Sequence, residues 1–211
     1  MGIIFGKINV ETPKYEVRHS CTDYEIRKYA PSVIAQVTYD PSELGGDKDG
    51  GFRILANYIG AFGQAQNTMP EKIAMTAPVI TRSQSEKIAM TAPVITKPED
   101  IAMTAPVVTA ASQEGRVTMQ FLLPSKYVRV EDAPRPTDER VVITEDGERK
   151  YGVVKFGGAA TDKVVEEKVE KLKKCLERDG HKITGEFMLA RYNPPFTIPA
   201  LRTNEVMIPI E

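Results

Sequence analysis

The side chains that could do metal or thiol chemistry are few and widely separated. The chain has two histidines, His19 and His181, and two cysteines, Cys21 and Cys175. No cluster of Cys, His, Asp and Glu at the spacing of a metal site surrounds any of them, and the cysteines lack the CxxC spacing of a redox or zinc pair. The sequence therefore predicts no metal ion and two free thiols, as expected in a reducing compartment.

Catalytic motifs are missing as well. The sequence contains no GxSxG elbow, HExxH pair, Walker loop or GxGxxG turn. The acidic pair Glu166-Glu167 stands among Lys163, Lys168 and Lys171, which is the pattern of a solvated helix face and not of an acid–base dyad. These observations favour a binding protein over an enzyme.

One segment near the C-terminus has the composition of a binding loop. It runs Ala190-Arg191-Tyr192-Asn193-Pro194-Pro195-Phe196, so that two prolines stiffen a loop with an aromatic residue at its tip. Such a loop can form one wall of an apolar cleft. It can equally be a rigid connection between two strands.

A helix predicted over residues 51–62 has an apolar arc wider than packing on a sheet requires. A helix that lies on a sheet needs an apolar stripe of only ~100° or a little more. The surplus face must be covered either by other parts of the chain or by a ligand, and the pattern leaves both open. The arc consists of Phe52, Ile54, Leu55, Ala56, Tyr58, Ile59, Ala61 and Phe62.

The remaining elements predict an α+β domain. A second helix is expected from Asp162 to Asp179, capped by Thr161, with one apolar face. Two units of strands, helix and strands predict a pseudo-twofold tandem repeat whose antiparallel or mixed sheet forms a distorted barrel flanked by two helices. Short β-branched and aromatic runs mark strands at 15–18, 24–29, 33–39, 117–123, 141–144, 151–156, 183–192 and 205–210.

A near-identical motif occurs three times within residues 71–109. Each copy, such as Lys72 to Val79, is predicted to be a short strand that ends at its proline. Duplication in a tolerant loop explains the repeat, and so does a soft apolar rim formed by Met75, Met90 and Met103. A third interpretation is an adhesive strand edge for a protein partner.

Bulk properties exclude several classes of protein. The formal net charge is −1, which gives no electrostatic footprint for nucleic acid. No apolar run approaches the ~20 residues of a membrane span, and the N-terminus does not read as a signal or transit peptide. We expect a cytoplasmic protein with no nucleic-acid partner and no membrane span.

Several stretches together resemble the SOUL haem-binding family, in its plant-type cytosolic form. The resemblance extends from about Pro13 to Ile210 and implies a single domain over residues 1–211, with half-repeats at about 13–115 and 116–211. The stretches that carry it are Tyr24-Glu25-Ile26-Arg27, Lys72-Ile73-Ala74-Met75-Thr76-Ala77-Pro78-Val79, Phe156-Gly157-Gly158, Tyr192-Asn193-Pro194-Pro195 and Arg202-Thr203-Asn204-Glu205-Val206.

The resemblance implies reversible binding of haem or another tetrapyrrole by a carrier or buffer. The porphyrin would lie in a shallow apolar groove between the first helix and the Pro-Pro loop. Where family members place Lys near the propionates, this chain has Asn57 and Thr197, which leaves Arg53 and Arg202 as the nearest basic side chains. The implied lining is Phe52, Arg53, Leu55, Ala56, Ile59, Asn193, Phe196 and Arg202.

Related two-repeat domains also include hydrolytic modules, so a small-molecule hydrolase remains an alternative. Glu205 as base, with Tyr192, would then be the candidates for catalysis. Neither histidine falls on the segments implied for the groove, so porphyrin burial and not iron ligation is expected to dominate binding.

Overall fold

The computed structural model describes residues 6–44, 49–83, 115–194 and 196–211. Its main element is one curled nine-stranded sheet in the order β1-β2-β7-β9-β8-β4-β5-β3-β6, in which each neighbouring pair of strands is antiparallel. The elements are β1 (Tyr15–Ser20), β2 (Glu25–Tyr29), β3 (Ser32–Tyr39), α1 (Gly50–Ile59), β4 (Val79–Ser83), β5 (Val117–Leu122), β6 (Val141–Asp146), β7 (Arg149–Gly157), α2 (Asp162–Arg178), β8 (Met188–Arg191) and β9 (Thr203–Ile210).

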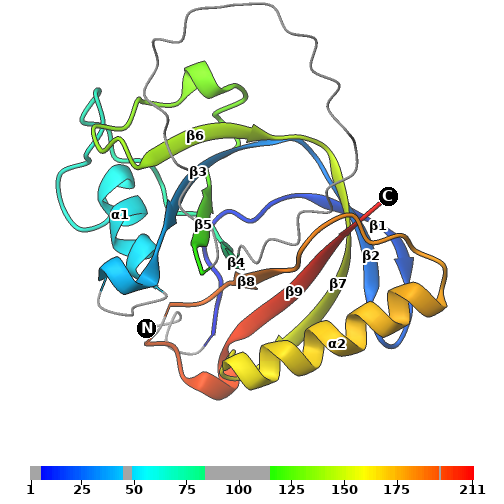
Figure 1. Cartoon of the computed structure of the whole chain (residues 1–211). Coiled ribbons are helices and arrows are strands. Elements are labelled where there is room, and N and C mark those ends of the chain that lie inside the picture. Colours follow the sequence, from blue (N-terminus) through cyan, green and yellow to red (C-terminus); the bar gives the residue numbers. More distant parts are fainter. Residues whose placement is uncertain (1–5, 45–48, 84–114, 195) are drawn as a thin grey trace, which may run out of the picture.

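Figure 1 shows the sheet curling into a half-barrel, with both helices on its outer surface. The predicted α+β class, with a curled antiparallel sheet and two flanking helices, is therefore confirmed. Of the helices in the described part of the chain, none combines the length and the hydropathy that crossing a bilayer requires.

The alternation of β3 sets the two faces of the sheet. Val33, Ala35 and Val37 pack in the core beneath α1. Gln36 lies on the opposite face, where its side-chain oxygen accepts a hydrogen bond from the Gln120 amide at 2.9 Å. This is the period of two that strand geometry imposes, and it separates an apolar outer layer from a mixed inner face.

Other parts of the chain cover most of the wide apolar arc of helix α1. Leu55 and Ile59 pack against the sheet, and Ile73 donates its backbone N–H to Ile59 at 3.0 Å. On another side, the buried Tyr58 hydroxyl donates to the Pro134 carbonyl at 2.8 Å, and Tyr127 joins the same core cluster. Of the two explanations for the arc, coverage by the chain accounts for most of it.

Helix α2 covers the other half of the sheet. Thr161 caps it, since its hydroxyl accepts the Val164 N–H at 3.4 Å, as predicted. The helix buries Val169 and Leu176 against β7 and β9. Gly152 on β7 allows this approach, because a Cβ there would lie 2.7 Å from the Leu176 side chain.

Residues 71–83, which hold the first copy of the repeated motif, differ from the prediction. The strand does not end at Pro78 but begins after it, as β4. Pro78 has no N–H to donate to a ladder, so pairing starts at the next residue. The second and third copies, at 86–109, lie outside the described residues, and the half-repeat boundaries at 13–115 and 116–211 stay a prediction.

Candidate functional site

An ion pair brings the start of the Pro-Pro loop to the start of α1. Arg191, at the end of β8, places its Nη1 2.6 Å from the Asp49 carboxylate, immediately before the helix. Figure 1 shows α1 and the segment after β8 at the same end of the molecule. The two segments that the sequence predicts to act together are therefore neighbours.

Side-chain and backbone bonds hold the loop in place. The Asn193 amide donates to the Gly6 carbonyl at 3.1 Å, and its oxygen accepts the Thr203 N–H at 2.7 Å. Arg202 donates its Nε to the carbonyl of the buried Thr197 at 2.9 Å. Asn193 and Arg202 thus fix the loop's shape, and the loop can present its other side chains without folding upon binding.

Large apolar side chains are exposed on both segments. Phe196 on the loop is 66 % exposed, and Phe62, three residues beyond α1, is 65 % exposed. Phe52 is half-buried between Phe62 and Phe121, with ring centroids 6.3 and 5.4 Å away. We use the name α1–loop face for the side chains of these two segments that reach the surface, which are Phe52, Arg53, Phe62, Phe196, Ile198 and Leu201.

Three residues of the predicted lining lie elsewhere. Leu55 and Ala56 are 0 % exposed and Ile59 is 2 % exposed, all packed between α1 and the sheet. A ligand on the surface cannot touch them in this structure, so they support the face from beneath. Phe52, Arg53 and Phe196 do reach the surface, and their contact with a tetrapyrrole stays a prediction.

Phe62, Ile198 and Leu201 were not part of the ligand-binding lining predicted from the sequence, although Phe62 belongs to the predicted apolar arc. Phe62 stands between Gly60 and Gly63, where a large aromatic follows the end of a helix. That context is a signal for an exposed side chain, because the chain turns away at Gly60, which has a positive φ of 77°. Exposure of the other two depends on the loop's conformation.

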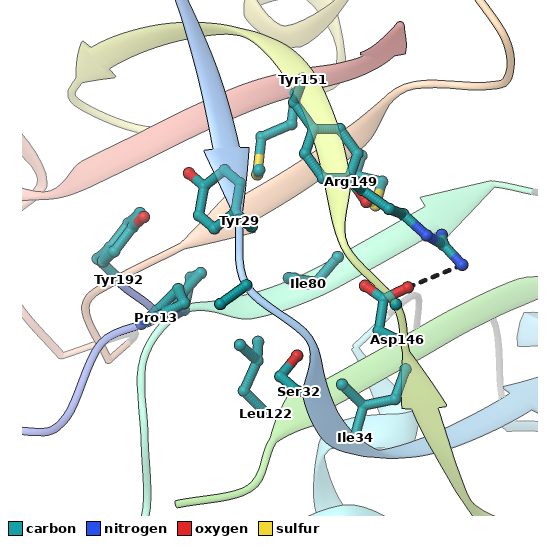
Figure 2. Close-up of a pocket in the computed structure, with 15 residues that line it drawn as sticks. Pro13, Tyr29, Ser32, Ile34, Ile80, Leu122, Asp146, Arg149, Tyr151 and Tyr192 are labelled. Carbon is teal, nitrogen blue, oxygen red and sulfur yellow. Dashed lines mark ion pairs between the residues drawn. The ribbon is translucent and has the colours of Figure 1, made fainter. Parts of the chain in front are cut away.

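The concave side of the half-barrel forms a second candidate, shown in Figure 2. Tyr29, Tyr151 and Tyr192 converge there with Met188 and Met207. The free space among these side chains is about 30 Å³. Since this is little more than a water molecule needs, the interior has no room for a macrocycle.

The residues suggested for hydrolysis belong to a buried network beside this interior. Glu205 accepts hydrogen bonds from Arg27 Nη1 at 2.9 Å and from the Tyr192 hydroxyl at 2.7 Å, one at each carboxylate oxygen. Burial, and then the charge of Glu205, raise the pKa of Tyr192, so its phenol keeps its proton. Each group is committed to another side chain, which is the arrangement of a structural ion pair.

The side chains around the α1–loop face offer no evident iron ligand among the described residues. The described residues hold no group of three or more His, Cys, Asp or Glu side chains that could bind a metal ion. The Tyr58 hydroxyl beneath the face already donates to a carbonyl, and Met75 packs against the core. His19 and His181 lie at a different part of the sheet, where both line one groove.

The family model of the SOUL heme-binding protein matches residues 10–87 and 96–209. The chain belongs to the SOUL heme-binding protein family. A comparison with curated protein sequences gave no match.

Several solved structures share the fold at low sequence identity. The C-terminal domain of EcmrR has a TM-score of 0.54 at 10 % identity, covering 93 % of this chain and 98 % of that one. A hydrolase from Listeria innocua has a TM-score of 0.51 at 12 % identity, covering 92 % and 94 %. An uncharacterized conserved protein from the same organism has a TM-score of 0.54 at 12 % identity, covering 90 % and 92 %. These likenesses establish the architecture and nothing about the ligand.

Proposed function

We propose that this SOUL family member binds haem or a related tetrapyrrole without catalysing a reaction, as a carrier or buffer. The observation that carries the proposal is the α1–loop face, where Phe62 and Phe196 stand about two-thirds exposed on segments that Arg191 and Asp49 tie together. Exposed aromatic rings on a rigid surface suit a flat macrocycle, because stacking costs little side-chain ordering.

Burial of the porphyrin face supplies most of the binding free energy. Roughly 300 Å² of apolar contact at ~25 cal/mol/Å² gives ~7 kcal/mol before the costs of association, which makes micromolar affinity a reasonable ceiling. Arg53 is exposed on α1 and gives the face a positive charge for a propionate. Iron ligation contributes little in this proposal, so iron-free protoporphyrin IX binds within about tenfold of hemin.

A porphyrin titration of paired variants tests the proposal. In Phe62→Ser/Phe196→Ser the affinity for protoporphyrin IX should fall at least tenfold, or ~1.4 kcal/mol, with the fold unchanged. Val17→Ser is the control and should bind like the parent, because Val17 is an exposed apolar residue on β1, at the opposite edge of the sheet from the strands that α1 covers. Equal affinity in all three proteins would refute this placement.

The hydrolase alternative rests on likeness of fold to the Listeria innocua structure. The buried network of Glu205, Arg27 and Tyr192 argues for the binding function, because neither oxygen of the carboxylate is left for a substrate proton. The alternative of a protein partner on the repeated strands falls mostly on residues outside the described part of the chain.

A further inference from the structure

A groove of about 550 Å³ lies on the outer face of the sheet, on the α2 side. Its position follows from the length of α2, which ends at Arg178 after covering Gly152 with Leu176. In the next row of the sheet Lys28 lies opposite Lys150 and Lys150 opposite Ile210; Lys150 is exposed there, whereas Ile210 is buried. A volume of several hundred cubic ångströms is that of a small-molecule site.

Both histidines of the chain line this groove, although they are far apart in sequence. His19 comes from β1 and His181 from the turn after α2. Each imidazole centroid is 6.2 Å from the ring centroid of the buried Tyr24, so both histidines pack near the same tyrosine. We call this the histidine groove, and its lining is Arg18, His19, Ile26, Lys28, Glu148, Lys150, His181, Ile210 and Glu211.

A bulge in β1 turns two consecutive side chains toward the groove. Val17 pairs with Arg27 and His19 with Ile26, so Arg18 is the extra residue on its strand. A bulge of this kind re-aims side chains that would otherwise alternate. Arg18 and His19 consequently line the same groove, and the charge of Arg18 is compensated by Glu16 at 2.9 Å.

The charges around the groove leave one cation uncompensated. Lys28 pairs with Glu148 at 2.8 Å, and Glu211 pairs with Lys182. Lys150 lies directly across the strands from Lys28 and has no ion-pair partner among the described residues. Like charges directly opposite in a sheet are destabilising, and a bound anion would relieve the repulsion.

We propose that the histidine groove binds a small amphipathic organic anion with a flat apolar body and one acidic group. The apolar body lies against the imidazole rings, above a floor closed by the largely buried Ile26 and Ile210, and the acidic group lies at Lys150. The two carboxylates on the rim, Glu148 and Glu211, disfavour a second negative charge next to them and restrict where the acid can lie. The site is separate from the α1–loop face and does not depend on it.

The chain's two histidines can report ligand binding in the groove. Because the groove contains both of them, their imidazole Cε1–H signals in proton NMR at constant pH report its occupancy, whatever else binds elsewhere. The probe is 1-anilinonaphthalene-8-sulfonate, a flat aromatic anion. Both signals should shift along a single binding curve. A rise in probe fluorescence with either histidine signal unmoved would overturn the proposal.

Two comparisons separate charge recognition from simple hydrophobic binding. Lys150→Glu should weaken probe binding at least tenfold, whereas Lys155→Glu, an exposed lysine on the same strand outside the groove, should change it less than twofold. N-phenyl-1-naphthylamine, the same ring system without the sulfonate, should bind the wild-type protein at least tenfold more weakly. Equal effects of the two substitutions on probe binding, or equal affinities of the wild-type protein for the charged and the uncharged probe, would contradict the proposal. The comparison of the two probes uses the wild-type protein alone and does not depend on the folding of a variant.

Discussion

The α1–loop face consists of side chains of a helix and a loop, whereas the histidine groove lies on the sheet beyond the end of α2, and the two differ in chemistry. The α1–loop face presents aromatic and aliphatic side chains, and its ion pair between Arg191 and Asp49 fixes geometry. The histidine groove has an apolar floor and a charged rim, with Lys28 opposite Lys150. The difference indicates that one surface selects a ligand by flat apolar area and the other by charge.

The largest effect on stability is expected from a substitution in the interior of the half-barrel, between the two surfaces. Arg27 and Glu205, whose side chains are 5 % and 4 % exposed, connect β2 to β9. Glu205→Gln removes the charge of the buried carboxylate that contacts the Arg27 guanidinium, which should cost about 3–5 kcal/mol of unfolding free energy. Chemical denaturation measures this loss.

Glu25→Gln is the matched control for that substitution. Its carboxylate also contacts Arg27, at 2.7 Å, but is 35 % exposed, so water can replace the interaction and the loss should stay below about 1 kcal/mol. Equal losses in the two variants would show that burial does not govern the network.

The next prediction distinguishes residues of the α1 region that stabilise the fold from residues that would contact the ligand. Leu55→Ala should lower stability by about 2–5 kcal/mol because it opens a cavity between α1 and β3. Phe62→Ala should change stability by less than about 0.5 kcal/mol, yet weaken porphyrin binding. Thermal melting and protoporphyrin titration of both variants check that one substitution lowers stability and the other lowers binding. A stable Leu55→Ala protein that has lost binding would place the ligand deeper than the face described here.

The smallest effect concerns the edge of the histidine groove. Hydrogen bonds from Arg178, and then from the Tyr24 hydroxyl, lower the pKa of Asp179 from 3.8 to about 2. Because the pKa of Asp179 is lower in the folded state, its carboxylate stabilises the fold at pH values above the ordinary pKa of 3.8. This contribution disappears as the pH falls toward 2. Asp179→Asn should therefore lower the melting temperature slightly at pH 7, and the difference from wild type should shrink between pH 4 and pH 2. A difference that is constant with pH would mean that the carboxylate charge is not involved.

Local patterns predicted the elements well. The Thr161 cap and the strand at residues 33–39 follow from short-range features, and the structure confirms them. The wide apolar arc of α1 was also evident, but which part of it reaches the surface was not. That depends on distant segments, such as those carrying Ile73 and Pro134, that cover the helix.

The histidine groove could not be predicted for a related reason. His19 and His181 meet only because β2, β7 and β9 are neighbours in the sheet and α2 ends short of their last row. Neither strand order nor the reach of a helix over a sheet is encoded in local periodicity. Taken singly, the two histidines were indistinguishable from ordinary surface residues.

Tetrapyrrole binding at the α1–loop face is tested most directly by a protoporphyrin IX titration in which affinity and the two histidine signals are recorded together. We expect micromolar binding that falls at least tenfold in Phe62→Ser/Phe196→Ser, while both histidine Cε1–H signals of the wild-type protein stay in place. Binding that is unchanged in the double variant and shifts both histidine signals would contradict it, because the tetrapyrrole would then occupy the histidine groove.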